Sequence, residues 1–225
     1  MEASGTQVEI SGEELTLLPS GAVYWTSRSA LLVADLHLGK AAAFRSLSVP
    51  VPAGSSDSTL NRLSQDLRET AAHKLFLLGD LWHAKAGRTA LIEQAFGEWR
   101  QRHADLEICL IEGNHDLKSG RMLEEWGVRE VSELEMSPFL LKHHPEEDPR
   151  GYVLAGHIHP AVRLVGKGRQ TERLPCFWFR ENAGVLPAYG DFTGAATMYP
   201  SAGDRVFVLA GSDVVEVGLS LPSMA

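Results

Sequence analysis

Hydrophobic and polar residues follow two patterns along the chain, and the pattern changes near residue 130. Before that point, apolar runs of strand length alternate with segments whose apolar residues recur at helical spacing. The helical segments are 55–72 and 89–103, and a short helical turn is expected at 122–126. The strand-like runs that precede polar residues are 30–34, 74–78 and 106–111. Strands and helices in alternation predict an α/β fold.

Beyond residue 130 the apolar runs become short and are separated by glycine, proline and charged residues, which favours strands over helices. We expect strands at 139–141, 152–155, 161–165, 176–179 and 206–209. Gly166-Lys167-Gly168 predicts a hairpin turn, and 6–34 also alternates like strands. Prolines on both sides of Glu146-Glu147-Asp148 indicate an exposed loop and not a metal site.

Length and composition are those of one globular domain covering residues 1–225. Hydrophobic residues make up 44% of the chain, but no apolar stretch reaches the roughly 20 residues that span a bilayer. The first residues do not read as a secretory signal and the last resemble no lipid acceptor, so we expect a cytoplasmic protein without membrane contact. Cys109 and Cys176 lie in apolar runs, and we expect both to be buried and reduced.

The formal net charge of −8 argues against a protein that coats duplex DNA, because such binding needs many Lys and Arg contacts to phosphates. A small catalytic footprint remains open, since cations follow several polar blocks at the ends of the predicted strands. These cations are Lys40, Arg45, Lys85, Arg88, Lys118 and Arg121. The alternative is that they are ordinary solvated charges. Trp82 and Phe44 could stack on nucleobases or simply pack in the protein.

Five polar blocks occur in a fixed order, each after a predicted strand. They are Asp35-Leu36-His37, Gly79-Asp80, Gly113-Asn114-His115-Asp116, His143-His144 and Gly156-His157-Ile158-His159. Seven of the nine histidines lie in or beside these blocks. Because the carboxyl ends of neighbouring strands meet at one edge of a sheet, we expect the blocks to form one site. Carboxylate, amide and imidazole donors in this number predict a centre for two metal ions.

Phosphodiester hydrolysis is the chemistry that such donors suit. It needs an activated water, neutralised phosphoryl oxygens and help for the leaving alkoxide, and two divalent metals about 3.5–4 Å apart meet the first two needs. Asp80, alone after a glycine, is the expected bridging carboxylate. In Asp35-Leu36-His37 and in His157-Ile158-His159, side chains two residues apart share a face of extended chain. We therefore expect Asp35 and His37 to reach one metal together.

The third block supplies both a ligand and a candidate acid. Asn114 offers a neutral carbonyl oxygen, which suits a metal that already has anionic charge around it. His115 is then free to protonate the leaving oxygen, and Asp116 is expected to hold its ring in the required tautomer. The mixed oxygen and imidazole set, without thiolate, points to manganese, iron or a similar ion and not to structural zinc.

The blocks resemble the signature of the calcineurin-like metallophosphoesterase superfamily, which is Asp-x-His, Gly-Asp, Gly-Asn-His-(Asp/Glu), His and Gly-His-x-His. The resemblance implies an α/β fold, the four-layer αββα metallophosphoesterase sandwich. It also implies two ligand sets that share Asp80. One set is Asp35, His37, Asp80 and His159, and the other is Asp80, Asn114, His143 and His157. His144 is a weaker candidate than His143, and the role of His83 stays open.

Further stretches resemble one family of that superfamily, the ligase-associated DNA damage response endonucleases called PdeM. They are 35–45, 49–54, 175–178 and 186–194. The resemblance implies a nuclease that uses Mn²⁺ on single-stranded DNA in DNA repair and is encoded beside a DNA ligase and a helicase. Tyr189, Asp191 and Ala195 depart from the family pattern, which leaves the role of the last stretch open.

Two other functions remain open. The same metals could serve a phosphodiesterase for small nucleotides or other phosphate esters, and the sequence separates this function from the nuclease poorly. A binding module that has kept the fold and lost catalysis is the third alternative. The intact His115 and the complete set of candidate ligands argue against it.

Overall fold

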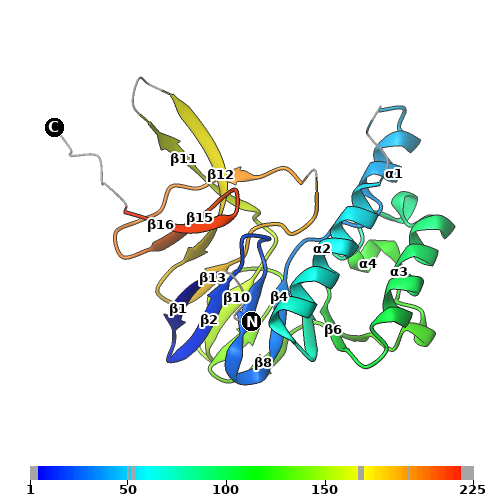
Figure 1. Ribbon diagram of the computed structural model, residues 1–225, viewed down its shortest axis with the longest axis horizontal. Helices are drawn as coiled ribbons and strands as arrows, with labels where there is room; N and C mark the ends of the chain where they lie inside the picture. Colours follow the sequence, from blue (N-terminus) through cyan, green and yellow to red (C-terminus); the bar gives the residue numbers. More distant parts are fainter. Residues whose placement is uncertain (1–4, 50, 52–53, 167–169, 192, 219–225) are drawn as a thin grey trace.

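Two β-sheets form the centre of the computed structural model, which describes residues 5–49, 51, 54–166, 170–191 and 193–218 (Figure 1). The first sheet has seven strands in the order of the sequence. They are β1 Thr6–Ile10, β2 Glu13–Leu17, β3 Val23–Trp25, β4 Ala30–Val33, β5 Lys74–Leu77, β6 Glu107–Ile111 and β7 Arg129–Val131. The pairs from β4 to β7 are parallel, so the carboxyl ends of these strands lie at the same edge.

The second sheet has nine strands with parallel and antiparallel pairs. They are β8 Leu134–Met136, β9 Phe139–Leu141, β10 Tyr152–Ala155, β11 Pro160–Val165, β12 Thr171–Phe179, β13 Ala183–Val185, β14 Ala196–Thr197, β15 Arg205–Ala210 and β16 Asp213–Val217. β10 lies between β9 and β13 and is parallel to both. β11 and β12 pair antiparallel, but Lys167 and Gly168 of the predicted hairpin turn lie outside the described residues.

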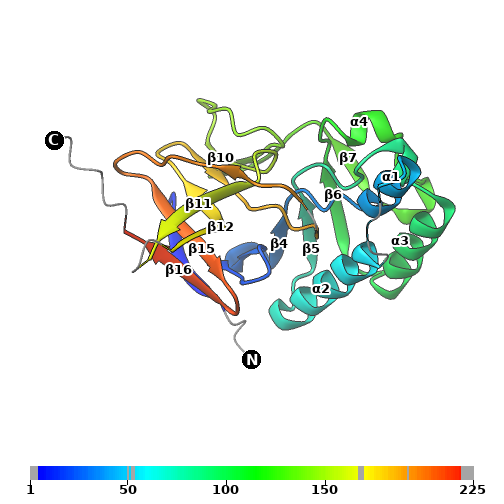
Figure 2. The same cartoon turned by 90° about the horizontal axis from the view of Figure 1, so that it is seen from above.

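The α-helices of the described chain lie on the side of the first sheet (Figure 2). They are α1 Lys40–Ser46, α2 Ser55–Thr70, α3 Ala90–Arg102 and α4 Asp116–Ser119. Short 3₁₀ helices occur at Thr26–Arg28, Lys85–Gly87 and Glu124–Trp126. The side chain of Thr89 caps α3 by accepting a hydrogen bond from the N–H of Ile92. α2 and α3 confirm the two helices predicted from apolar spacing.

Two hydrophobic cores hold the layers together. The first joins the sheet β1–β7 to the helices, and it includes Leu77 of β5, Leu63 of α2 and Trp99 of α3. The second lies between the two sheets and includes Leu32 of β4 and Phe177 of β12. Burial of this apolar surface stabilises the stacked layers, and it thereby fixes the strand ends that carry the polar blocks.

The two mixed sheets with helices confirm the predicted α/β metallophosphoesterase sandwich. One detail differs from expectation, because no α-helix occurs among the described residues after 119, and none covers the outer face of the second sheet. The sequence explains this difference. Beyond residue 130 the chain lacks the helical spacing that would let a helix bury an apolar stripe.

The predictions for the acidic cluster and for the two cysteines are also confirmed. The acidic cluster 146–148 lies in a loop, where Asp148 pairs with Lys142 and Arg150. Cys109 and Cys176 are buried and unpaired. In the described part of the chain, no helix combines the length and the apolar character that a membrane crossing requires.

Candidate metal centre

The candidate ligands lie just beyond the carboxyl ends of strands, as the apolar runs before them predict. β4, β5 and β6 of the first sheet and β9 and β10 of the second sheet precede them. The seven residues are Asp35, His37, Asp80, Asn114, His143, His157 and His159. Neighbouring strands of two stacked sheets therefore deliver side chains that are as much as 124 positions apart in sequence to one place.

The backbone at five of these seven residues is left-handed and not extended. The φ angles are 55° at Asp35, 46° at His37, 53° at Asp80, 71° at His157 and 51° at His159. The prediction that the pairs in Asp-x-His and His-x-His share a face of extended chain is therefore wrong. Each left-handed residue costs on the order of 1–3 kcal/mol, so the surrounding structure must hold it. The N–H of His37, for example, donates to the carbonyl of Asp80 at 2.9 Å.

Glycines next to the ligands leave room for the ligand side chains. A Cβ on Gly79 would overlap Nδ1 of His143, and a Cβ on Gly113 would overlap the carboxylate of Asp80. Gly79 also has a φ of 85°, which glycine adopts without strain. These contacts give a physical reason for the glycine in the Gly-Asp and Gly-Asn blocks.

One group of donors consists of Asp35, His37 and His159, whose ligand atoms lie within 4.8 Å of one another. Nε2 of His159 is 3.3 Å from Nε2 of His37 and 3.4 Å from Oδ1 of Asp35. Oδ1 of Asp35 is buried and has no hydrogen-bond partner among the described residues. A buried carboxylate oxygen is costly without a partner, and a cation among these three donors would supply one.

A second group surrounds Nε2 of His143. This nitrogen is 3.1 Å from Oδ1 of Asn114 and 3.1 Å from Nδ1 of His157. Oδ1 of Asp80 lies 3.6 Å from it. The other oxygen of Asp80, Oδ2, lies 3.9 Å from Nε2 of His37 in the first group. The carboxylate of Asp80 thus stands between the two groups, which is the placement that a bridging ligand requires.

Backbone carbonyls orient two of the imidazole rings. Nδ1 of His143 donates to the carbonyl of Leu78 at 2.9 Å, and Nδ1 of His159 donates to that of Gly194 at 2.9 Å. Each ring then directs its Nε2 lone pair toward the donor groups. Metal-binding histidines are held in this way, with one ring nitrogen bonded to an acceptor and the other free for the ion.

Burial favours neutral rings at His37 and His157. Burial, followed by the neighbouring charge of His159, lowers the pKa of His37 to about 2. Burial and then His143 lower the pKa of His157. Burial also acts to lower the pKa of His159, but the carboxylate of Asp35 raises it overall. His37 and His157 beside the buried carboxylates of Asp35 and Asp80 supply electron pairs next to negative charge. The residues present therefore fit a site for two metal ions.

His115 stands at the edge of the centre, where its side chain is 36% exposed and can meet a substrate. Its Nε2 is 3.8 Å from Oδ2 of Asp80, and its Nδ1 donates to the backbone carbonyl of His83. The N–H of His115 also donates to Oδ1 of Asp80 at 2.9 Å. The ring is thereby oriented with Nε2 toward the centre, and the group that orients it is a carbonyl.

The role predicted for Asp116, to hold the ring of His115, is wrong. The carboxylate of Asp116 is buried and accepts hydrogen bonds from the N–H groups of Trp82 and Gly113, both at 3.0 Å. It thus ties the loop after β6 to the loop after β5. The two residues are adjacent in sequence, but the helical turn that starts at Asp116 directs its side chain to the backbone instead.

His83 belongs to the site although the sequence assigned it no role. Its ring stacks on that of His115 with centroids 5.3 Å apart, and its Nδ1 is 3.4 Å from Nδ1 of His37. These three histidines can converge on one point. The available signal was its position three residues after Asp80, in the loop that leaves β5. The ring of Phe44 on α1 is also near that of His83, with the two centroids 5.8 Å apart.

Burial helps to decide two questions that the sequence left open. They are whether His143 or His144 is the ligand, and whether Trp82 can stack on a nucleobase. His143 is 2% exposed and faces both Asn114 and Asp80, whereas His144 is exposed and contacts the ring of His157. This geometry favours His143 as the ligand. Trp82 is fully buried, and its indole packs among neighbouring rings of the first core, so it cannot stack on a nucleobase.

A sandwich of two mixed sheets with carboxylate, amide and imidazole donors gathered at the strand ends defines a metallophosphoesterase. Comparison with solved structures gives the same class. The crystal structure of Pseudomonas putida nuclease MPE shares 37% sequence identity and a TM-score of 0.81, and the match covers 92% of this chain and 97% of that chain. The chain belongs to the calcineurin-like metallophosphoesterase superfamily, in the same family as that nuclease, and is an enzyme of this class.

Two other solved structures are similar at a lower level. Yfce, a phosphoesterase from E. coli, has 14% identity and a TM-score of 0.43, with 84% of this chain and 97% of that chain covered. The protein AQ665 from Aquifex aeolicus has 19% identity and a TM-score of 0.40, with 58% and 78% covered. Neither similarity supports a functional argument. No family model and no curated protein matches the chain.

Proposed function

We propose that this protein is a manganese-dependent endonuclease that hydrolyses phosphodiester bonds of single-stranded DNA in DNA repair. The observation that carries the proposal is the similarity to a nuclease over 92% of the chain at 37% identity. The two groups of buried donors support it, because a nuclease of this class needs a pair of divalent cations.

The proposed ligand sets follow the two donor groups. One cation is held by Asp35, His37, Asp80 and His159, and the other by Asp80, Asn114, His143 and His157. The unpartnered Oδ1 of Asp35 supports the first set, and the position of Asp80 between the groups supports its bridging role. Oxygen and imidazole donors without thiolate suit Mn²⁺, which is the cation we propose.

The chemistry divides between the cations and the protein. When bound, the cation pair supplies an acidified water and neutralises charge on the phosphoryl oxygens. Asp35, His37 and Asp80 would hold the cations in place, since backbone contacts fix these left-handed residues. His115, in its protonated form, gives a proton from Nε2 to the leaving oxygen, while the His83 carbonyl retains the proton on Nδ1.

A functional association with a DNA ligase and a helicase accompanies the proposed role in repair. It is supported by the stretches that resemble the ligase-associated family, among them 35–45 and 186–194. The complete donor set and the exposed His115 argue against a binding module without catalysis.

One experiment separates the nuclease from a phosphodiesterase for small esters. The purified protein with Mn²⁺ is incubated with circular single-stranded DNA, with duplex DNA and with a nitrophenyl phosphodiester. Cleavage of the circle is the expected result, and only an endonuclease can produce it. Hydrolysis of the nitrophenyl ester without any cleavage of the circle would contradict the proposal and favour a phosphodiesterase for small nucleotides.

A further inference from the structure

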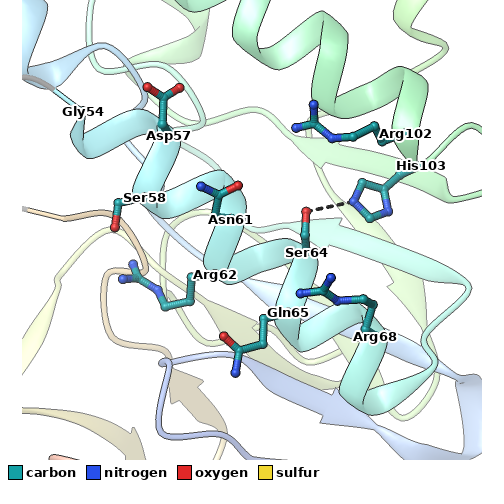
Figure 3. A pocket seen from close by; sticks show the side chains of 10 residues that line it. All are labelled: Gly54, Asp57, Ser58, Asn61, Arg62, Ser64, Gln65, Arg68, Arg102 and His103. Carbon is teal, nitrogen blue, oxygen red and sulfur yellow. Dashed lines mark hydrogen bonds between the residues drawn. The ribbon is translucent and has the colours of Figure 1, made fainter.

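A hollow with a volume of about 1150 Å³ runs along the surface of α2 and is closed on one side by the end of α3 (Figure 3). We call it the arginine trough. Gly54, Asn61, Gln65 and Arg68 lie along its α2 wall, at positions that share one face of the helix. Arg102 and His103, at the end of α3, form the opposite wall.

The first turns of α2, along which the trough runs, contact residues next to the candidate metal centre. The hydroxyl of Ser56, in the first turn of α2, accepts a hydrogen bond from the N–H of Gly39 at 3.0 Å, two residues after His37. One turn and a half further, Arg62 pairs with Asp191 at 2.8 Å. Asp191 lies in the same loop as Gly194, whose carbonyl orients a candidate ligand. A substrate strand that is bound at the metal centre can therefore continue along α2.

The charge of the trough is opposite to that of the whole protein. Three arginines and one carboxylate, Asp57, line it, whereas the full chain has 21 Lys and Arg against 29 Asp and Glu. Arg62 is neutralised by Asp191. Arg68 and Arg102 are exposed, and within the described ranges no residue forms a hydrogen bond or an ion pair with either guanidinium.

The guanidinium groups of Arg68 and Arg102 lie on either side of one pair of side chains. Figure 3 shows them on either side of the hydrogen bond between Ser64 and His103, which measures 2.9 Å. Burial, and then the charges of Arg102 and Arg68, lower the pKa of His103. The one carboxylate that lines the trough, Asp57, lies in the first turn of α2, whereas Arg68 lies in its last turn. Two cations on either side of one point attract an anion such as a phosphate group.

The length of the trough selects a polymer over a small ester. From Gly54 to Arg68 the helix rises by about 21 Å, at about 1.5 Å per residue. A path of this length is longer than a mononucleotide, but a single strand of several nucleotides can follow it. Asn61 and Gln65, which lie between the two ends, add neutral hydrogen-bonding groups along this path.

We propose that the arginine trough binds the phosphate backbone of single-stranded DNA outside the scissile bond, with Arg68 and Arg102 each neutralising one phosphate. This inference rests on the proposed endonuclease function. The trough would give that enzyme a way to hold a long substrate. It also explains how a chain with a net charge of −8 can use a small basic surface for DNA.

The test compares Arg68→Gln/Arg102→Gln with the wild-type protein in Mn²⁺. The substrates are a single-stranded oligonucleotide of about 20 nucleotides, which spans the trough, and a nitrophenyl phosphodiester, which does not. We expect the ratio of kcat/KM on DNA to kcat/KM on the ester to fall by about tenfold, since two charged contacts are lost. The slope of log kcat/KM for DNA against log salt should shrink by about 1.4, at about 0.7 per phosphate of a single strand.

A matched control is Arg129→Gln/Arg163→Gln, which removes the same charge from exposed positions on β7 and β11. It should keep the wild-type ratio and the wild-type salt slope. The trough proposal would be overturned if the trough variant and the wild type had equal salt slopes, or if both variants lost the same fraction of the DNA-to-ester ratio. Either result would leave the endonuclease proposal intact. If the wild type cleaves the ester and no DNA, the proposed function fails first, and the trough proposal falls with it.

Discussion

The hydroxyl of Tyr189 donates a hydrogen bond to the carboxylate of Asp66 at 2.8 Å, and both side chains are buried. Asp66 lies on α2, whereas Tyr189 lies in the loop that follows β13. Arg62, one turn before Asp66, donates to the carbonyl of Tyr189 and to Asp191. Side-chain hydrogen bonds of Arg62 and Asp66 therefore attach this loop to α2.

The same loop also contacts residues of the candidate metal centre that follow strands of both sheets. The N–H of Tyr189 donates to the carbonyl of Ala34 at 2.8 Å, and that of Gly190 donates to the carbonyl of Asp35 at 3.1 Å. Its Gly194 carbonyl orients His159. The stretch 186–194, whose role the sequence left open, thus supports one candidate ligand from each sheet.

Tyr189→Phe should destabilise the protein by about 1–3 kcal/mol, because the buried carboxylate of Asp66 loses a donor. The free energy of unfolding in urea measures this loss. Tyr199→Phe is the matched control, since Tyr199 is 86% exposed, and it should change the stability by less than about 0.5 kcal/mol. Equal effects of the two substitutions would show that the hydroxyl of Tyr189 contributes nothing.

Asp66→Asn should change how stability depends on pH. Burial raises the pKa of Asp66 above its ordinary value, despite the hydrogen bond from Tyr189. Above about pH 4 the unfolded chain has released this proton while the folded protein still holds it, so wild-type stability falls as the pH rises to the raised pKa. Asn has no such proton. The Tm of Asp66→Asn minus that of the wild type should therefore increase from about pH 4 upward, and a constant difference would contradict the raised pKa.

Gly79→Ala should damage the metal centre more than the fold. The added Cβ would overlap the ring of His143 in the second donor group. A ligand displaced by about 1 Å can lower the rate on the order of 100-fold, so we expect at least that loss of ester hydrolysis together with weaker Mn²⁺ binding by calorimetry.

Gly12→Ala is the control for backbone strain in this comparison. Gly12 has a φ of 80° against 85° at Gly79, but nothing lies within 4 Å of its added Cβ. This substitution should cost about 1–2 kcal/mol of stability for the left-handed backbone and leave hydrolysis unchanged. Similar activity in the two variants would mean that the contact with His143 does not restrict the site.

His115→Ala should separate substrates by their leaving groups. Its side chain faces Asp80 from the edge of the site, so its removal should leave the metal content unchanged. General acids contribute on the order of 10²–10⁴-fold, and we expect that loss on DNA, whose alkoxide leaves poorly. Nitrophenolate needs no proton, so the nitrophenyl ester should suffer much less. Equal losses on both substrates would refute the role of an acid.

Sequence by itself determined the elements and the order of the candidate ligands. Largely apolar runs of four or five residues form β4, β5 and β6 because most of their side chains are buried between layers, and the polar blocks begin just after these strands end. The helical spacing of apolar residues in 55–72 predicted α2, because one face of this helix is buried. These features are local, since they depend on which face of each element is buried.

Tertiary structure alone decided how the ligand side chains meet. Asp35 and His37 are left-handed because backbone contacts with the next block hold them, and a pattern of residue types does not encode φ. Asp116 faces the backbone and the His83 carbonyl faces His115 because loops from different strands pack together. Such contacts join residues that are 32 or more positions apart, and only the packing of the sheets brings them within hydrogen-bonding distance.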